Sequence, residues 1–188
     1  NVKGHGFVVT GSVLGGELKK GDEVFLLPST NKGYKVRGIQ RHSAEVDNVV
    51  AGDRAAINLS GLKLEDFKRG MVLTDSDFEG TKLIDVNIEL FAESKKLKRW
   101  SGAMFHSGTF QTPARIHLLN CDELLPGENA IAQIHLENPG ILLNKDRFVL
   151  RSGSGDKTIG GGIIFDDNPL HHRKRTKNLL ESITVVSE

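Results

Sequence analysis

Apolar and polar residues alternate with a period of two through most of the chain. In the first half the alternation runs through FVVTGSV, DEVFLLP, YKVRGIQ, RAAINLS and GMVLTD. The second half repeats it in LIDVNIELFA, ARIHLL, NAIAQIHLE, DRFVLRS and GGGIIFD. This period is typical of β-strands that bury one face. Turn-forming stretches such as GGELKKGD, STNKG, LPGEN and ENPG separate the segments, so the chain is predicted to be all-β, built of barrels or sandwiches.

The stretch FEGTK, at 78–82, lies near the middle of the chain and suggests a domain boundary. Two antiparallel β-barrels of ordinary small-domain size fit the lengths on either side, over 1–80 and 81–168. The last segment, 169–188, differs, because Asn-Pro ends the preceding strand and a basic run follows. Leu179, Leu180 and Ile183 then have helical spacing, which predicts a short C-terminal helix over about 174–183.

Composition narrows the classes of protein that fit this pattern. The 188 residues are 38% hydrophobic and 26% charged, which is globular, and the net charge of +1 excludes a uniformly basic protein. Nucleic-acid contact would therefore depend on local patches. One cysteine, Cys121, cannot build a disulfide framework, and no apolar run approaches the roughly 20 residues that span a bilayer, so we expect a cytoplasmic protein. The start at NVKGHG, without methionine, suggests a fragment of a longer chain.

Motifs for catalysis, nucleotide binding or metal binding are missing from the sequence. GHGFVVTG begins as G-x-G but lacks the third glycine of a dinucleotide site, and no phosphate loop G-x-x-x-x-G-K-[ST] occurs. The seven histidines form no H-x-x-x-H or H-E-x-x-H pair, and nothing resembles G-x-S-x-G. We therefore expect no catalytic residues, no metal and no cofactor in this chain. A catalytic set assembled by the fold is not excluded, but solvated surface charges are the simpler interpretation.

Three basic groups are candidates for anion binding. KLKRW at 96–100 puts cations beside the one tryptophan, and HHRKRTK at 171–177 carries four cations. RSGSGDKT at 151–158 is a glycine-serine loop between Arg151 and Lys157, whose backbone N–H groups can approach phosphates closely. The alternative for each group is an ordinary solvated surface.

Arg54, in AGDRAAINL, is a fourth candidate because it opens an apolar strand. It has two interpretations. It pairs with a neighbouring carboxylate such as Asp53, or it offers an anion a fixed fork of donors. The sequence by itself favours the ion pair.

Several ordered motifs resemble one protein family. GHGFVVTGSVLGGELKKGDEVFLLP, KVRGIQRHSAEVDNVVAGDRAAINLSGL and FKRGMVL are similar to the second domain of the elongation-factor-Tu class of translational GTPases. HSGTFQTPARIHLL and DRFVLRSGSGDKTIGGGIIFDDNP resemble the third domain. Within the class, VRGIQRH, AGDRAAINL, DRFVLR and TIGGG are similar to the selenocysteine-specific elongation factors, the SelB family. NPLHHRKR resembles the bacterial form, whose chain continues into winged-helix domains. The many glycines then serve as barrel corners and hairpins that also let RNA approach.

The resemblance implies a site for the aminoacylated 3′ end of tRNA in the first domain. Gln40 and the loop at Gly52 and Asp53 match the region that holds the terminal adenosine. Arg54 matches an arginine that faces the amino acid, where a selenol, which is more acidic than a thiol, is largely an anion near neutral pH. The family also uses an Asp-Arg pair just upstream of the segment that matches Asn1, so the pocket is incomplete here.

Contacts with the tRNA backbone are also implied by the resemblance. Arg69 matches an arginine near the 5′ phosphate, and the loop with Arg151, Ser152, Gly153 and Lys157 matches a contact to the T-arm. The GTP-binding domain, with its Mg²⁺, and the modules that bind the messenger-RNA hairpin would lie outside this chain. The implied partners are selenocysteinyl-tRNA and the ribosome.

Other interpretations remain open at this point. Within the class, the chain could belong to elongation factor Tu itself or to the gamma subunit of initiation factor two, although Arg54 and the basic tail argue against both. From other classes, a β-barrel enzyme using His106 or His117 and a structural interaction module also fit the pattern.

Overall fold

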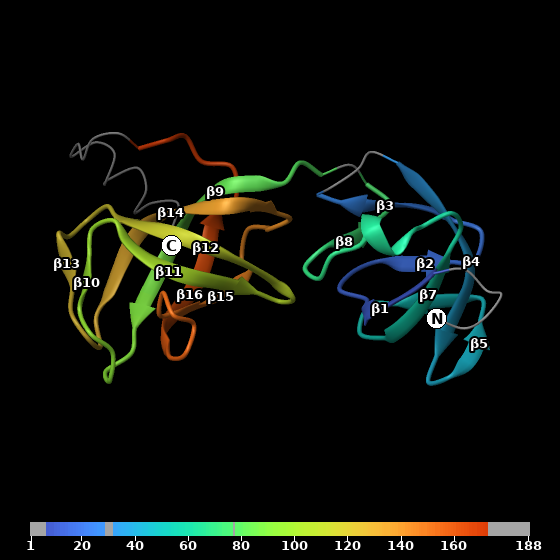
Figure 1. Ribbon diagram of the computed structural model, residues 1–188, viewed down its shortest axis with the longest axis horizontal. Helices are drawn as coiled ribbons and strands as arrows, with labels where there is room; N and C mark the ends of the chain where they lie inside the picture. Colours follow the sequence, from blue (N-terminus) through green and yellow to red (C-terminus); the bar gives the residue numbers. More distant parts are fainter. Residues whose placement is uncertain (1–6, 29–31, 77, 173–188) are drawn as a thin grey trace. The chain divides into compact units, whose positions relative to one another are not determined.

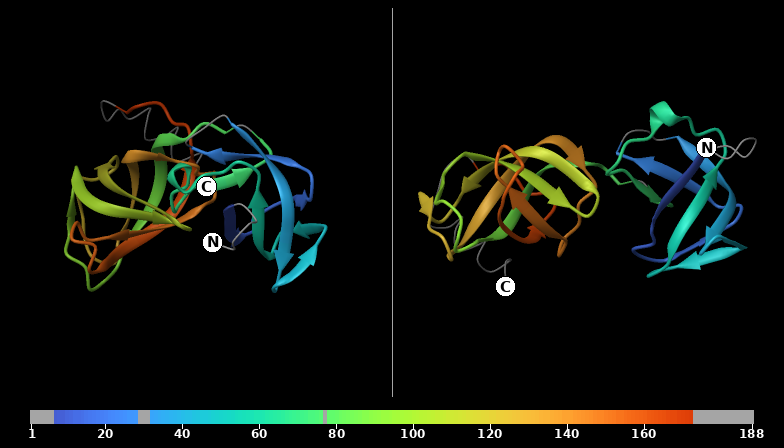
Figure 2. Two further views of the ribbon diagram at one scale, coloured as in Figure 1. Left: turned by 45° about the vertical axis from the view of Figure 1, so that its right-hand side comes forward. Right: turned by 60° about the horizontal axis from the view of Figure 1, so that its bottom comes forward.

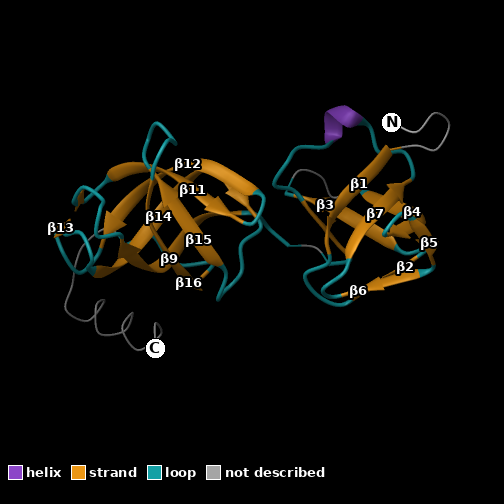
Figure 3. Ribbon diagram, turned by 90° about the horizontal axis from the view of Figure 1, so that it is seen from below, coloured by secondary structure: helices purple, strands orange, loops and turns teal. Residues whose placement is uncertain are grey.

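The computed structural model describes residues 7–28, 32–76 and 78–172. The chain divides into two compact units, Asn1–Glu79 and Gly80–Glu188, which are described separately. Apart from one 3₁₀ turn, the regular structure of the described residues is β throughout (Figure 3). The all-β prediction is thus confirmed. The predicted C-terminal helix over 174–183 lies outside the described residues.

The first unit is a twisted antiparallel sheet with a small second ladder. Its elements are β1 (Phe7–Ser12), β2 (Glu17–Lys19), β3 (Glu23–Leu27), β4 (Gly33–Arg41), β5 (Ala44–Val46), β6 (Asn48–Val50), β7 (Arg54–Leu59), the 3₁₀ turn η1 (Leu64–Asp66) and β8 (Val72–Thr74). The sheet order is β1-β7-β4-β3-β8, with β5 paired to β4, while β2 pairs with β6 separately (Figure 1). These ladders do not join into a closed barrel among the described strands, so a closed barrel is confirmed only for the second unit.

The core of the first unit follows from the alternation in its strands. Along β7, Ala55, Ile57 and Leu59 are buried, whereas Arg54, the first residue of the strand, is exposed. Val24 and Leu26 of β3 point into the same core. The opposite face of the β4–β7 pair is exposed to solvent, and it carries the predicted site residues Gln40 and Arg54.

The second unit is a closed six-stranded barrel, and its strands wrap round one core in each view (Figure 2). Its strands are β9 (Thr81–Leu90), β10 (Leu97–Lys98), β11 (Ser101–Ser107), β12 (Phe110–Leu118), β13 (Glu123–Leu124), β14 (Asn129–Gly140), β15 (Arg147–Arg151) and β16 (Thr158–Asp166). The closed order is β11-β12-β14-β9-β16-β15, and β10 pairs with β13. Every barrel strand pairs with two neighbours, which leaves no open edge in the wall.

Glycine allows close approach of two strands in this wall. Gly162 of β16 lies opposite Ile88 of β9, and a Cβ at this position would overlap the carbonyl oxygen of Asn87 and crowd the ring of Phe148. The run Gly160–Gly162 therefore allows close packing of the barrel strands.

Candidate nucleic-acid interface

Gln40 and Arg54 share the outer face of the β4–β7 pair. Gln40 lies opposite Ala56 in this ladder, and Arg54 is two residues before Ala56 on the same strand. Because side chains alternate along a strand, both residues point to the same side, as diagonal neighbours about 7–8 Å apart. On the next strand, β1, Ser12 lies opposite Arg54 and Thr10 opposite Ala56. The fold thus brings the two predicted residues together over a floor of small side chains.

The turn between β6 and β7 fixes the start of Arg54's strand. Gly52 has φ of 95°, which suits glycine, and its N–H donates to the carbonyl oxygen of Val13 at 2.9 Å. Val13 in turn donates its N–H to the carbonyl oxygen of Asp53 at 2.9 Å. The Asp53 carboxylate accepts a further bond from the N–H of Val50, at 3.0 Å. The turn is therefore held from both sides, and Gly52 is required by backbone conformation whether or not it contacts RNA.

Asp53 forms its ion pair with Arg41 rather than with Arg54. Nη1 of Arg41 lies 3.2 Å from Oδ2 and 3.3 Å from Oδ1 of Asp53. The pKa of Asp53 is lowered, first by the N–H of Val50 and then by Arg41. Arg54 is exposed and has no hydrogen bond or ion pair to any other described residue. The interpretation of Arg54 as the partner of Asp53 is wrong, because the end of β4 brings Arg41 to this carboxylate instead.

Arg69 lies in the segment between η1 and β8, followed by Gly70 with φ of 95°. Its side chain is exposed and pairs with no carboxylate in the described part of the chain. A cation in this position can reach a phosphate oxygen without breaking an internal bond.

The glycine-serine loop after β15 is closed around its own carboxylate. The hydroxyls of Ser152 and Ser154 both donate to Oδ1 of Asp156, at 2.5 Å, and these bonds lower the pKa of Asp156 to about 2. The N–H of Ser152 donates to the carbonyl oxygen of Lys157 at 2.8 Å, and that of Gly155 to the carbonyl oxygen of Ser152 at 2.7 Å. These two N–H groups are therefore already bonded within the loop.

Gly153 and Lys157 of the same loop remain on the surface, and both are exposed. Arg151 is half-buried, and its Nη2 donates to the carbonyl oxygen of Asp156 at 3.4 Å. Phosphate contact by this loop would therefore depend on Lys157 and on the exposed backbone at Gly153.

Three arginines lie on the outer face of β12 and β15, the two strands that pair with β11. Arg147 and Arg151 alternate with buried residues of β15, and Arg115 does so on β12, so all three point outward. Met104 of β11 lies opposite both Arg151 of β15 and Pro113 of β12 and adds apolar surface to this face. Burial, and then Arg151, lower the pKa of His106, so this face takes its charge from the arginines at pH 7. Arg115 and Arg147 were not among the residues predicted from the sequence, although their alternation with apolar residues could have indicated them.

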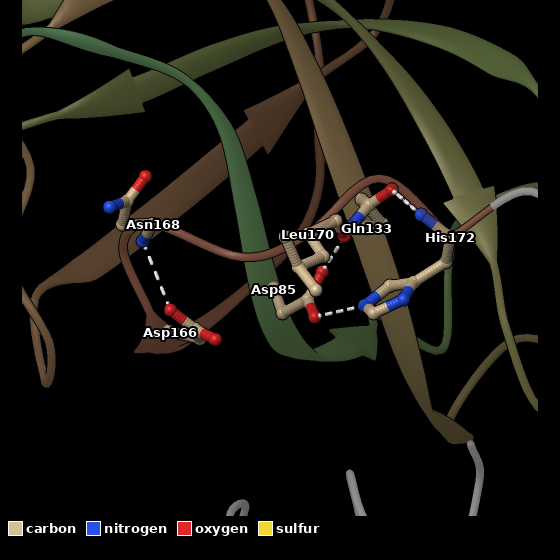
Figure 4. A network of polar contacts seen from close by, with 6 residues as sticks. All are labelled: Asp85, Gln133, Asp166, Asn168, Leu170 and His172. Atoms are coloured by element: carbon tan, nitrogen blue, oxygen red, sulfur yellow. Dashed lines mark hydrogen bonds and ion pairs between the residues drawn. The ribbon is translucent and has the colours of Figure 1, made fainter.

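The other histidine of the enzyme interpretation, His117, is buried and stacks on Trp100, with ring centroids 4.3 Å apart at 11°. A carboxylate–histidine pair does occur elsewhere in the barrel. Nε2 of His172 lies 2.6 Å from Oδ2 of Asp85, which is 2% exposed (Figure 4). Gln133 joins this pair, donating to Asp85 at 2.8 Å and to the carbonyl oxygen of Leu170 at 3.0 Å. The pair fastens the segment after β16 to the barrel wall, so its role is structural.

Metal and membrane features are not found in the described residues. No group of three or more His, Cys, Asp or Glu side chains there is arranged to hold a metal ion. No helix in the same residues is long and apolar enough to span a bilayer. An open groove of about 510 Å³ lies beside β4 and β5, and it is lined by none of the predicted site residues.

Comparison with known proteins identifies related families for both units of the chain. Residues 6–74 match the family model for elongation factor Tu domain 2, and residues 83–171 match the β-barrel domain of the selenocysteine-specific elongation factor. Similar proteins include the selenocysteine-specific elongation factor of Desulfomicrobium baculatum, 36% identical over 93% of this chain and 27% of its own length. The factor of Escherichia coli (strain K12) is 31% identical over 99% of the chain and 29% of its own length.

The chain therefore spans less than a third of the length of these curated relatives. The two matched domains follow each other in the chain and together cover most of it. On this evidence, the chain belongs to the selenocysteine-specific elongation factor family of translation factors.

Proposed function

We propose that this chain holds the aminoacylated acceptor arm of selenocysteinyl-tRNA within a longer, cytoplasmic elongation factor. In this proposal the first unit binds the aminoacylated 3′ end, and the second unit contacts the acceptor and T-arm backbone. GTP and Mg²⁺ would bind to the part of the factor that carries a phosphate loop, since this sequence contains none. The ribosome and a messenger-RNA hairpin would be contacted by the assembled factor.

The observation that carries the proposal is the unpartnered guanidinium of Arg54. This cation is exposed, has no ion pair among the described residues, and lies on the face that also carries Gln40. A selenol is largely ionised near neutral pH, whereas a serine hydroxyl is neutral. A charge-assisted hydrogen bond from Arg54 would favour the selenolate by about 1.5–3 kcal/mol. The site would thus discriminate between the two aminoacyl groups by charge.

The arginine face of the barrel supports the second half of the proposal. Arg115, Arg147 and Arg151 present cations from two strands, β12 and β15, which both pair with β11, and Lys157 lies in the loop after β15. Such a surface suits the regular phosphates of a double-stranded arm, because phosphate contacts position the RNA without depending on its sequence. Arg69 of the first unit would add a contact at the 5′ phosphate.

A second candidate is the same role in another tRNA-carrying GTPase, such as elongation factor Tu. The first unit matches elongation factor Tu domain 2, which favours this candidate for that unit alone. The match of residues 83–171 to the β-barrel of the selenocysteine-specific factor argues against it.

The test is Arg54→Ala in the full-length factor, with selenocysteinyl-tRNA and seryl-tRNA compared in the same assay. Loss of about 1.5–3 kcal/mol corresponds to an affinity for selenocysteinyl-tRNA that is about 10- to 150-fold weaker. Seryl-tRNA should be held almost as well as before. Equal losses for both tRNAs would refute the role of Arg54 in amino-acid selection.

A further inference from the structure

Three charged residues lie where β4 ends and β7 begins. Arg41 is the last residue of β4, Asp53 ends the turn before β7, and Arg54 is the first residue of β7. Nη1 of Arg41 is shared between both oxygens of Asp53, at 3.2 and 3.3 Å. The Asp53 side chain is 18% exposed and that of Arg41 43%. Arg54 makes no such contact with any described residue.

The turn needs the side chain of Asp53 for a structural reason. Its Oδ2 accepts the N–H of Val50 and so closes the turn that leads into Arg54. A carboxylate in this position has a cost for the proposed ligand, because Asp53 directly precedes Arg54, the residue whose cation would bind a selenolate. Asp53 and Arg54 alone would have no net charge. Arg41 adds one positive charge, so the three groups together have a net charge of +1.

We propose that Arg41 is a specificity-determining residue that neutralises Asp53 and so leaves the charge of Arg54 for the anionic amino acid. The inference rests on the proposed function, because it concerns the same aminoacyl site. Arg41 acts through Asp53 and the local field; it need not touch the amino acid itself. Its effect is therefore on the ratio of selenocysteinyl-tRNA to seryl-tRNA affinity, since only the selenolate is charged.

Three variants of the full-length factor separate charge compensation from simple fastening of the turn. They are Arg41→Gln, Asp53→Asn and the two combined. An asparagine at position 53 keeps an oxygen that can accept the N–H of Val50, so the turn bond survives while the charge is removed. If Arg41 acts through charge, Arg41→Gln should lower the preference for selenocysteinyl-tRNA by roughly two- to fivefold, the range of an exposed ion pair. The combined variant should return the preference to within about twofold of wild type.

The opposite result is expected if the ion pair only fastens the turn. Each single variant would then break the same contact, and the combined variant would be no better than Arg41→Gln. Weakening of both tRNAs to the same extent would also overturn the inference. Arg37→Gln is a matched control, since Arg37 is another exposed arginine of β4 and has no contact with Asp53. A change of preference in Arg37→Gln equal to that in Arg41→Gln would show an unspecific effect of charge and would overturn the inference.

Failure of this inference can be distinguished from failure of the proposed function. Arg54→Ala is measured in the same experiment. If Arg54→Ala weakens both tRNAs equally, the aminoacyl role of the site fails. If Arg54→Ala removes the preference and Arg41→Gln leaves it unchanged, only the role of Arg41 fails.

Discussion

The polar contacts that hold the segment after β16 against the barrel allow a quantitative prediction about stability. Gln133 is fully buried and uses its whole side-chain amide (Figure 4). Its Nε2 donates to Oδ1 of Asp85 and to the carbonyl oxygen of Leu170, and its Oε1 accepts the N–H of His172 at 3.0 Å. Gln133→Met keeps the length and nearly the volume of the side chain, so the change removes hydrogen bonds without opening a cavity.

The magnitude follows from which groups lose their partners. Leu170 is 85% exposed and His172 is only partly buried, so the backbone groups of both residues can bond to water when the amide is lost. Asp85 lies in the barrel wall and is 2% exposed, so its carboxylate cannot replace the lost hydrogen bond with one to water. A hydrogen bond to a charged group contributes about 1.5–3 kcal/mol. Because the two neutral bonds are partly replaced by water, we expect Gln133→Met to lower the free energy of unfolding by about 2–3 kcal/mol.

Trp100 gives an assay specific for this unit. It is the one tryptophan of the chain, it precedes β11, and its ring stacks on His117. Its fluorescence therefore reports the urea unfolding of the barrel. With a urea slope of about 1.5–2 kcal/mol/M, the midpoint should fall by about 1–2 M.

The matched control for this measurement is Gln111→Met. Gln111 is an exposed glutamine of the neighbouring strand β12 and has no hydrogen bond from its side chain to another described residue. Its replacement should change the free energy of unfolding by less than about 0.5 kcal/mol. Equal midpoints for the two variants would refute the reasoning, since the buried amide would then contribute nothing beyond its volume.

Three other predictions follow from the packing and the charges. Gly162→Ala should destabilise the barrel by about 1–3 kcal/mol or more in urea unfolding, because a Cβ there overlaps the opposite strand. Gly102→Ala has open space at its Cβ and should not destabilise the barrel, so similar losses for the two variants would contradict this prediction. The carboxyl group of Asp156 should titrate near pH 2 when followed by NMR, so the stability that its ionised form contributes is present above the ordinary pKa of 3.8 and is lost as the pH falls towards 2. Ser154→Ala should raise this titration midpoint, and an unchanged midpoint would show that the Ser154 hydroxyl does not lower the pKa. Arg69→Ala should weaken selenocysteinyl-tRNA and seryl-tRNA alike and reduce the salt slope by about one, while an unchanged slope would argue against a phosphate contact.

The alternation of apolar and polar residues predicted much of the fold because burial of one face is a local property of a strand. The strand at Arg147–Arg151 is an example, since its alternation also determines which arginines face outward. The closure of the wall depends on which strands pair, and the two units differ in this respect despite similar alternation.

The candidate site was predictable only in part, because its contacts also depend on residues that are distant in the sequence. The proximity of Gln40 and Arg54 was implied by resemblance to a family and has a counterpart in the strand register. The partner of Asp53 was not predictable, because Arg41 is 12 residues away and Arg54 is adjacent. The contact of Asp85 with His172 spans 87 residues, and no periodic pattern carries such information. Asp156 was visible in the loop sequence, but the direction of its side chain depends on hydroxyl groups that only the folded loop brings together.

In the proposed complex, Arg54 contacts the ionised amino acid while the Asp53 carboxylate is occupied by Arg41. A structure of the full-length factor bound to selenocysteinyl-tRNA tests both parts together. We expect the guanidinium of Arg54 to lie in direct contact with the selenium atom and the Asp53 carboxylate to remain paired with Arg41. A structure in which Arg54 turns to Asp53, or in which the selenium is contacted only by other groups, would contradict it.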